Sequence, residues 1–487
     1  MRGEKLQLSP PGLRIGPLRC GKVFILTGRI EKDMTNSLIV LGVMLAVLVA
    51  GSFVRKVPVA VLLVIASIAG AIVGGLTDPL LHRDYFSSLA SVFVGNSETV
   101  PSLMRHFMEG SMLFLNLMLT VAAGMLFMSI LKENGALNLL TREIVSGFYK
   151  SPTLLLILIM ILIMLPAMLT GSAPASVLST GVLVLPILLE IGVSKDDAAA
   201  IIALGSLFGM VAPPVNVPAM LIGTGVYMPY EGFAIPLLFL TLPLAIFSVL
   251  YIGRRSVSKV DKDAVLSKIP GDPAVKGFIP QFPLVFLIGY MIIKSYYPQI
   301  DPGTPLVFCM GIIVALLCSK KTINLWKVSV QSMSESIEVM ALFAAVGMMI
   351  QIMGLTGARG ATVLGALGLK GPLLYLSIAA VAPFVGGLLM PFGCAGVLGI
   401  PLIMAFTNKN AIWVTSALTL IMCVGALLPP TSVSGQFAAR AVGVENQGKM
   451  LKKCILPALL SLALSVFVMV YANEIVVFLR GLGIPLK

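Results

Sequence analysis

The sequence predicts an all-α polytopic membrane protein built from two inverted repeats, and three observations lead to this prediction. Of the 487 residues, 58% are hydrophobic and 11% are charged, whereas soluble domains carry about 25% charged residues. Long apolar runs recur, and many approach the roughly 20 residues that span a bilayer without the alternation of a barrel strand. The third observation is an order of elements that occurs twice.

The first repeat is predicted over residues 34–253. An amphipathic segment at 133–150 is too polar to span and is expected to lie flat at the membrane interface. A re-entrant hairpin at 153–193 follows, with two apolar arms around a tip of small residues. Next comes a helix at 197–228 that the sequence APPVNVPA breaks, because proline removes a backbone donor. Further helices are expected at 37–54, 57–75, 111–131 and 232–252.

Residues 254–280 are the most charged segment and are predicted to link the halves. The second repeat, 281–487, has the same order: an interfacial piece at 357–371, a hairpin at 372–408, and a helix at 411–441 broken by LPPTSVSG. Its other helices are expected at 282–298, 304–319, 336–354 and 454–480.

The register of the two copies agrees closely. The hairpins contain GVLVLP and GVLGIP. From the end of this motif to the next proline pair is 27 residues in the first half (Pro186 to Pro213) and 28 in the second (Pro401 to Pro429). Each half has five predicted crossings if the hairpins do not cross. Because five is odd, the second half starts on the opposite face, and the repeat is inverted. Inverted repeats with broken helices are typical of secondary transporters.

Positive charge predicts the orientation, because cytoplasmic loops carry an excess of Lys and Arg. The face that carries the linker has 19 of these residues and the other face has 8, leaving residues 1–33 aside. The linker is therefore predicted to be cytoplasmic and both termini to lie outside. Residues 1–33 add seven positive charges on the outer face and lack a signal-peptide core. We expect them to be an N-terminal extension that translation from Met34 would omit.

Composition argues against several functions. The net charge of +13 arises from residues that fall mostly between apolar runs, so it favours topology over nucleic-acid binding. The two histidines and six scattered cysteines form no CxxC motif and no metal or catalytic set. No P-loop is present. We therefore expect neither an enzyme nor an ATPase, and no cofactor.

The two breaks carry the expected chemistry. Unwound backbone is tolerated at membrane depth only where it is buried in protein or lines a cavity. Its carbonyls can hold a hard cation such as Na⁺, and half-helix N-termini can face a carboxylate. We predict two related sites around one cavity, with Na⁺ held by carbonyls near Ser172, Asn216 and Ser432. The candidate binding residues are Gly171, Ser172, Ala173, Pro214, Val215 and Asn216 in the first half and Gly386, Gly387, Gly393, Cys394, Pro430, Thr431, Ser432 and Ser434 in the second.

A simpler alternative is that the prolines only kink the helices and the polar groups cap the kinks. Glu335 and Glu338 are interpreted in the same structural way. They stand at the start of a predicted helix, where carboxylates favour the helix dipole.

The chain resembles the large membrane subunit of tripartite ATP-independent periplasmic (TRAP) transporters, within the ion-transporter superfamily. LTGSAPAS at 169–176 is similar to the family's first tip, and GMVAPPVNVP and GALLPPTSV are similar to its two breaks. GGLLMPFGCAG at 386–396 falls where the second tip should be. Here Met390 precedes the proline, where the family usually carries an acidic residue.

The resemblance implies a permease subunit of the inner membrane that imports an organic anion, such as a C4-dicarboxylate, by Na⁺ symport. It also implies a small membrane subunit and a periplasmic solute-binding protein as partners, and an elevator movement of the hairpins. Two alternatives remain open. One is a stand-alone ion-coupled symporter or exchanger of the same superfamily, and the other is a membrane scaffold that transports nothing.

Overall fold

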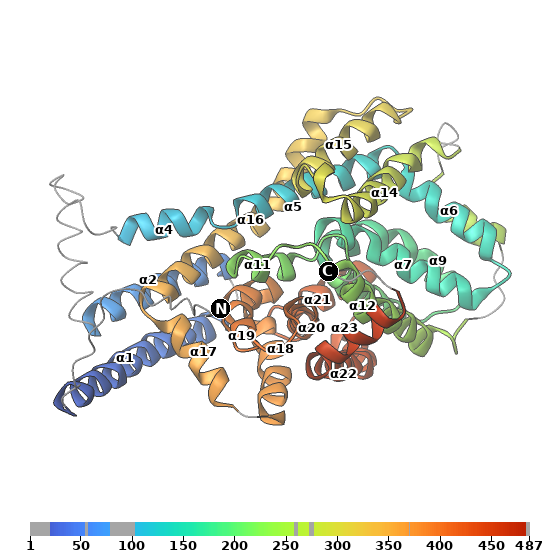
Figure 1. Ribbon diagram of the computed structural model, residues 1–487. Helices are drawn as coiled ribbons and strands as arrows, with labels where there is room; N and C mark the ends of the chain where they lie inside the picture. The colour runs from blue at the N-terminus through green and yellow to red at the C-terminus, as the bar shows by residue number, and fades with distance from the viewer. Residues whose placement is uncertain are drawn as a thin grey trace, which may run out of the picture.

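The computed structural model describes residues 20–53, 57–77, 103–257, 262–271, 277–369 and 371–483, and this part of the chain is helical with no strand. Nine helical segments within it are long and apolar enough to cross a membrane. The prediction of an all-α polytopic membrane protein is confirmed (Figure 1).

The first half runs from α1 to α12. Its elements are α1 (Cys20–Ser52), α2 (Val59–Thr77), α4 (Leu103–Met112), α5 (Leu115–Glu133), α6 (Ala136–Phe148), α7 (Pro152–Thr170), α8 (Ala173–Ser176), η1 (Val177–Gly181), α9 (Val182–Glu190), α10 (Lys195–Val211), α11 (Val217–Gly225) and α12 (Ala234–Gly253).

The same order of helices, hairpin and broken helix follows in the second half. Its elements are α13 (Lys262–Ser267), η2 (Ile279–Gln281), α14 (Phe282–Tyr296), η3 (Pro298–Ile300), α15 (Thr304–Leu317), α16 (Leu325–Leu355), α17 (Ala358–Gly368), α18 (Pro372–Cys394), η4 (Ala395–Gly399), α19 (Ile400–Met404), α20 (Ala411–Val424), η5 (Gly425–Leu427), α21 (Val433–Val442), α22 (Gln447–Val470) and α23 (Ala472–Gly481). The inversion between the halves and the domain boundaries stay predictions.

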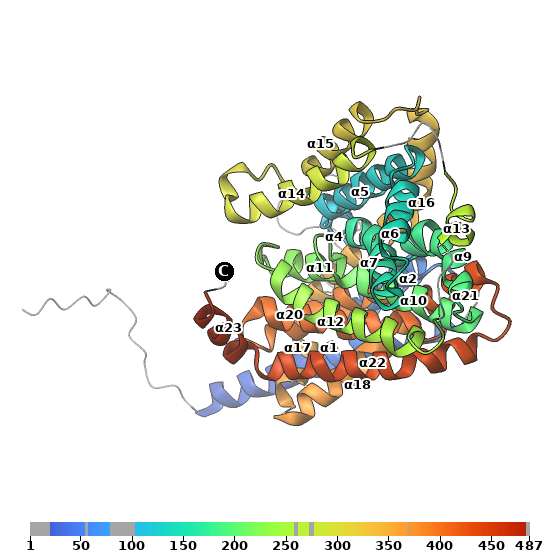
Figure 2. The same cartoon turned by 90° about the vertical axis from the view of Figure 1, so that its right-hand side faces the viewer.

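The helices form two groups. In the scaffold group, α16 packs against α2, α4 and α5, α1 packs on α2, and α15 joins α5 to α14. Figures 1 and 2 both show α14 and α15 at one edge of the molecule. The hairpin group holds both hairpins, both broken helices, α12 and α22. The interfacial helices α6 and α17 each contact both groups: α6 meets α5 and α7, and α17 meets α1 and α19.

The broken helices form the core of the hairpin group. Helix α10 contacts α7, α12, α20, α21 and α22, and its residues from Asp197 to Val211 are all buried. In α20, every residue from Trp413 to Val424 is buried. Burial on all sides explains why these two helices are apolar all round rather than amphipathic.

Some predicted helix limits are wrong. The helix expected at 336–354 begins at Leu325, where the Asn324 side chain accepts the Lys327 N–H at 3.1 Å as an N-cap. Its first three turns contain polar residues, so hydropathy alone detects only the later part. The final helix likewise begins at Gln447, after the cap Asn446, and ends in the separate helix α23.

The helix expected at 111–131 is preceded by α4. Helix α1 starts at Cys20, upstream of Met34, while residues 1–19 lie outside the described part. A translation start at Met34 stays a prediction.

Candidate functional site

The first hairpin turns at Gly171, between α7 and α8. Gly171 has a left-handed backbone (φ +68°), and the Ser172 hydroxyl accepts the Ala175 N–H at 3.4 Å to start the second arm. A Cβ atom on Gly171 would lie 2.3 Å from the Val217 side chain. Glycine is therefore needed here both for its φ and for the close approach of the tip to α11.

The first break lies directly on this tip. The Val215 N–H donates to the Met168 carbonyl at 3.0 Å, which joins the unwound backbone to the end of α7. The Pro213–Pro214 bond in this segment is cis. Ala173 follows the tip as the first residue of α8. The predicted residues of the first site are thus brought together.

Asn216 closes the first break through three side-chain hydrogen bonds. Its Oδ1 accepts the Ala219 N–H at 2.9 Å and so caps α11. Its Nδ2 donates to the Val211 carbonyl at 2.8 Å and to Thr419 Oγ1 at 3.2 Å. Its own N–H donates to the Tyr230 hydroxyl at 2.9 Å, and burial raises the pKa of that phenol. Both N–H donors of the Asn216 amide and one lone pair of its oxygen are therefore used by the protein. The second lone pair of Oδ1 and the carbonyls nearby remain for a ligand.

The second break is held on the second hairpin in a similar way. Both the N–H and the hydroxyl of Thr431 donate to the Gly387 carbonyl, at 3.1 and 2.8 Å. A Cβ atom on Gly386 would lie 2.4 Å from the Met422 carbonyl oxygen. The two glycines let the first arm of the hairpin approach the broken helix at backbone distance.

The polar groups of the second break differ in how far they are satisfied. The Ser432 hydroxyl donates to the Leu427 carbonyl at 3.1 Å, and the Gln436 amide donates to the Pro430 carbonyl at 3.0 Å. Ser434 is fully buried, and its Oγ finds no hydrogen-bond partner among the described residues. A buried hydroxyl without a partner is uncommon, so Ser434 Oγ is free to be a ligand.

The second hairpin turns at Met390, whose backbone has φ 61° and ψ 160°. Such a conformation is rare for a residue with a side chain and occurs mostly at functional sites. Gly393 and Cys394 lie beyond the turn, on the second arm. The Cys394 thiol is buried and donates to the Ala382 carbonyl at 3.4 Å, so it joins the two arms.

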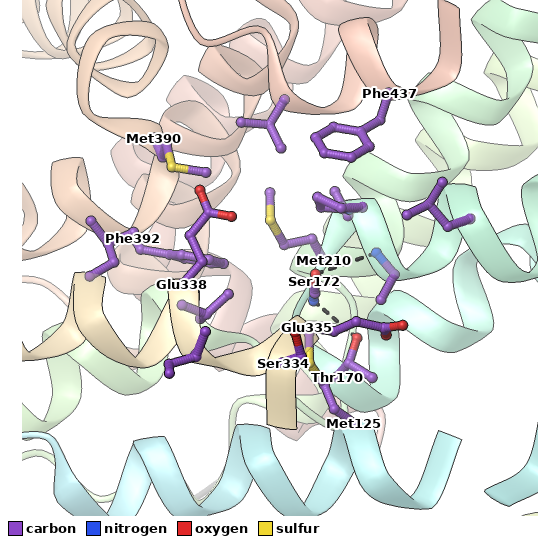
Figure 3. Close-up of a pocket in the computed structure, with 18 of the residues that line it drawn as sticks. Met125, Thr170, Ser172, Met210, Ser334, Glu335, Glu338, Met390, Phe392 and Phe437 are labelled. Atoms are coloured by element: carbon purple, nitrogen blue, oxygen red, sulfur yellow. Dashed lines mark hydrogen bonds between the residues drawn. The ribbon is translucent and has the colours of Figure 1, made fainter. Parts of the chain in front are cut away.

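A cavity of about 810 Å³ lies between the hairpin group and α16 (Figure 3). We call it the tip cavity, because both tips line it. Its volume is that of a site for a small organic molecule. The lining residues that matter below are Thr170, Ser172 and Ala173 from the first tip, Met390 and Phe392 from the second, Met210 from α10, Thr431, Val433 and Phe437 from the second break and α21, and Ser334, Glu335 and Glu338 from α16.

Three of the predicted site residues line this cavity: Ser172, Ala173 and Thr431. The others do not line it, and some of them, such as Val215 and Gly387, hold the hairpins on the breaks. The two predicted halves of the site are joined away from the cavity as well, since Asn216 of the first break contacts Thr419 of α20.

The sequence did not predict the acidic side of the cavity, which Glu335 and Glu338 of α16 form. Glu335 and Glu338 do not begin a helix, because α16 starts ten residues before Glu335. Both line the tip cavity, as do Lys132 and Glu133 in the last turn of α5. The available signal was an ionisable pair close to a long apolar run, which in a membrane segment indicates function.

The fold and cavity together define a class of protein: a polytopic transport protein with paired hairpins and broken helices. The family model described as "Tripartite ATP-independent periplasmic transporter, DctM component" matches residues 66–475. The chain belongs to this family. It is therefore a multi-pass inner-membrane protein of a TRAP-type secondary transporter, and not an enzyme. In TRAP systems the family works with a small membrane subunit and a periplasmic binding protein.

Two further comparisons add little. The crystal structure of the Alcanivorax borkumensis YdaH transporter, described as having an unusual topology, is similar at 14% sequence identity and a TM-score of 0.48. The match covers 73% of this chain and 85% of that chain. A TM-score this low does not establish a common fold. No curated protein matches the sequence.

Proposed function

We propose that the chain is a permease subunit that imports an organic anion, a C4-dicarboxylate or a related carboxylate, by Na⁺ symport. One observation carries this proposal: both hairpin tips, the second break and the scaffold helix α16 line a single cavity. A solute bound there would touch both helix groups at once. Movement of one group past the other could then carry it across the membrane.

The carboxylate would bind at the second break. Helix α21 begins without a side-chain cap, and Thr431 and Val433 beside its N-terminus line the cavity. Free amides at a helix N-terminus favour negative charge. Hydroxyls of the first tip, such as that of Ser172, would supply further hydrogen bonds.

The coupling ion would bind beside the breaks. Na⁺ prefers oxygen ligands, and the described residues hold no cluster of His, Cys, Asp or Glu that suits a transition metal. The residues present fit Na⁺, because Ser434 Oγ is buried without a partner among the described residues and Ser434 closely follows the unwound segment in the chain. Near Ser172 and Asn216 the side-chain oxygens already accept capping hydrogen bonds, so backbone carbonyls would be the main ligands of the first site, and the Ser172 O–H stays available as a donor to the carboxylate.

Orientation and movement complete the proposal. Pro58, Lys132 and Val328 line the cavity at helix ends predicted to face the cytoplasm, and we infer that the mouth of the cavity lies on this side. We infer an inward-facing state, with the linker inside and both termini outside. Fusion of alkaline phosphatase to the C-terminus should give active enzyme in the periplasm, whereas a fluorescent green fluorescent protein fusion at that end would contradict this topology.

Reconstitution tests the function. The chain, its small membrane subunit and a solute-loaded binding protein are placed in proteoliposomes, and uptake of labelled solute is followed. We expect uptake only with an inward Na⁺ gradient and the binding protein. Uptake that needs the gradient but no partner would favour a stand-alone symporter instead. The Ser434→Ala variant should raise the Na⁺ concentration for half-maximal uptake, while Ser465→Ala, whose buried hydroxyl also lacks a partner among the described residues, should not.

A further inference from the structure

The scaffold helix α16 presents two carboxylates to the tip cavity. Glu335 and Glu338 are three residues apart, so they lie on neighbouring positions of one helix face. At 1.5 Å per residue they stand about 15 and 20 Å along the axis from Leu325. Both are exposed to the cavity. In the view of Figure 3 the Glu338 carboxylate lies on the side of Met390, and Glu335 on the side of Thr170.

These carboxylates are not neutralised by the protein. The Gln331 amide donates to Glu335 at 3.1 Å, and Glu338 has no hydrogen bond or ion pair within the described part of the chain. Other acidic groups are paired: Asp197 with Lys453 at 3.1 Å, and Glu190 with Lys268. An unpaired charge within a membrane helix is costly and marks a functional pathway.

The opposite charge in the cavity lies elsewhere. Among the described lining residues the charged ones are three glutamates and one lysine, Lys132. Lys132 and Glu133 end α5 on the side where α16 begins, so they lie at the mouth. The deeper part between α16 and the tips therefore has negative charge only.

The two sides of the cavity thus favour opposite charges. The side formed by Thr431 and the N-terminus of α21 supplies donors for a carboxylate. The side formed by α16 supplies acceptors and negative charge. A solute with carboxylates at both ends and no cation would place a bare carboxylate against Glu335 and Glu338, where like charges repel, whereas an ammonium group beside that carboxylate would offset the repulsion.

We propose that Glu335 and Glu338 determine specificity, and that the carboxylate solute also carries a cationic nitrogen, which faces α16. The inference rests on the proposed function in one respect, namely that the tip cavity holds the transported solute. It narrows that solute from carboxylates in general to zwitterionic ones.

Charged thiol reagents measure which charge the cavity favours, in an experiment that needs no transport. Ser334 lines the cavity beside Glu335. S334C is introduced into the full chain after its natural cysteines have been replaced, and it is reacted with a cationic and an anionic methanethiosulfonate. The ratio of the cationic to the anionic reaction rate is then divided by the same ratio for free mercaptoethanol. We expect a corrected ratio of at least about ten, as for other charged clefts. The E335Q/E338Q background should bring it close to one.

Matched variants guard against misfolding. E335D/E338D keeps both charges and should keep the raised ratio, and Glu474→Gln, on the exposed first turn of α23, should not change it. A corrected ratio near one in the S334C chain would overturn the proposal. So would a raised ratio that the E335Q/E338Q change leaves intact.

Uptake separates this proposal from the proposed function. Succinate and aspartate share a four-carbon dicarboxylate skeleton and differ by one ammonium group. In the reconstituted complex, aspartate should be preferred, and E335Q/E338Q should reduce that preference at least about tenfold. The inference would be overturned if the natural chain and the E335Q/E338Q variant both preferred succinate, and to the same degree. Absence of Na⁺-driven uptake of either solute would count against the proposed import of this skeleton, while the thiol ratio still decides the charge preference.

Discussion

At the scale of the residue, Asn216 shows how one side chain can hold a broken membrane helix together. Its amide bridges the end of α10, the start of α11 and Thr419 of the other broken helix. Each unwound polar group in lipid needs such a partner. The Asn216 side chain thus satisfies backbone groups that the break would otherwise leave without partners.

Replacement of Asn216 by alanine should cost about 2 kcal/mol of stability or more, because a cap and two buried hydrogen bonds are lost together. The measurement is the thermal midpoint of the purified chain in detergent. Asn324→Ala is the matched control, since Asn324 caps α16 with a single hydrogen bond and should cost about 1 kcal/mol. Equal losses for both variants would show that Asn216 is no more than a cap.

A substitution at Gly386 tests how closely the second hairpin approaches its broken helix. A Cβ atom there would meet the Met422 carbonyl oxygen at 2.4 Å, and backbone cannot move aside cheaply. Gly386→Ala should therefore destabilise the protein by about 1–3 kcal/mol. Gly360→Ala in α17, where nothing lies within 4 Å, should be neutral or slightly stabilising. A thermal midpoint for Gly386→Ala at or above that of Gly360→Ala would contradict this packing.

At the scale of the element, the linker helix α13 is bound to the interfacial helix α6 and to the hairpin group. Arg142 of α6 donates to the carbonyls of Leu266 and Ile269, at 3.1 and 2.9 Å. Lys268 pairs with Glu190 at the end of α9. A segment that looks like a simple connection in the sequence therefore joins the first interfacial helix to the first hairpin.

Loss of the Arg142 side chain should release α13. We expect hydrogen exchange of residues 262–271 to rise about tenfold in Arg142→Ala, because hydrogen bonds from a charged group contribute about 1.5–3 kcal/mol. Mass spectrometry of the exchanged peptides gives the rate. Arg440→Ala, an exposed arginine on α21, is the control. Unchanged exchange of this peptide would mean that Lys268 and Glu190 hold α13 unaided.

At the scale of the whole molecule, α17 and α16 each contact the hairpin group at a defined residue. Arg359 of α17 donates to the Gly225 carbonyl at the end of α11, at 3.1 Å. Gly396 of the second hairpin lies against Val346 of α16. A Cβ atom added to Gly396 would lie 3.5 Å from the Val346 Cβ. An elevator movement would have to break both contacts.

A disulfide across this boundary should therefore stop transport. The distance of 3.5 Å between the Val346 Cβ and a Cβ at position 396 lies within the range that a disulfide needs. V346C/G396C should therefore form a disulfide on oxidation. We expect uptake to be lost when oxidised and restored by reductant. The control pair G74C/T356C, with a Cβ separation of 3.4 Å, joins two parts of the scaffold group and should leave uptake unchanged. Full uptake through an oxidised V346C/G396C protein would exclude movement at this boundary.

Much of the hairpin group could be predicted from the sequence. The hairpins and breaks are marked by glycine and proline, whose backbone limits are local and need no tertiary context. The roles of Glu335 and Glu338 could not be predicted in that way. Hydropathy locates the apolar part of a helix and not its true start, which the Asn324 cap sets.

The amino-acid sequence alone is enough to predict that this chain spans a membrane, breaks two helices at matching places and carries a hairpin before each break. These properties follow from local composition, because lipid allows few backbone conformations. Which polar groups remain free for a ligand depends on how the distant parts of the chain pack together. This packing engages Asn216 and leaves Ser434 without a partner among the described residues. It also places two glutamates of the scaffold opposite the tips. That choice depends on contacts between residues far apart in the chain, which no local pattern records.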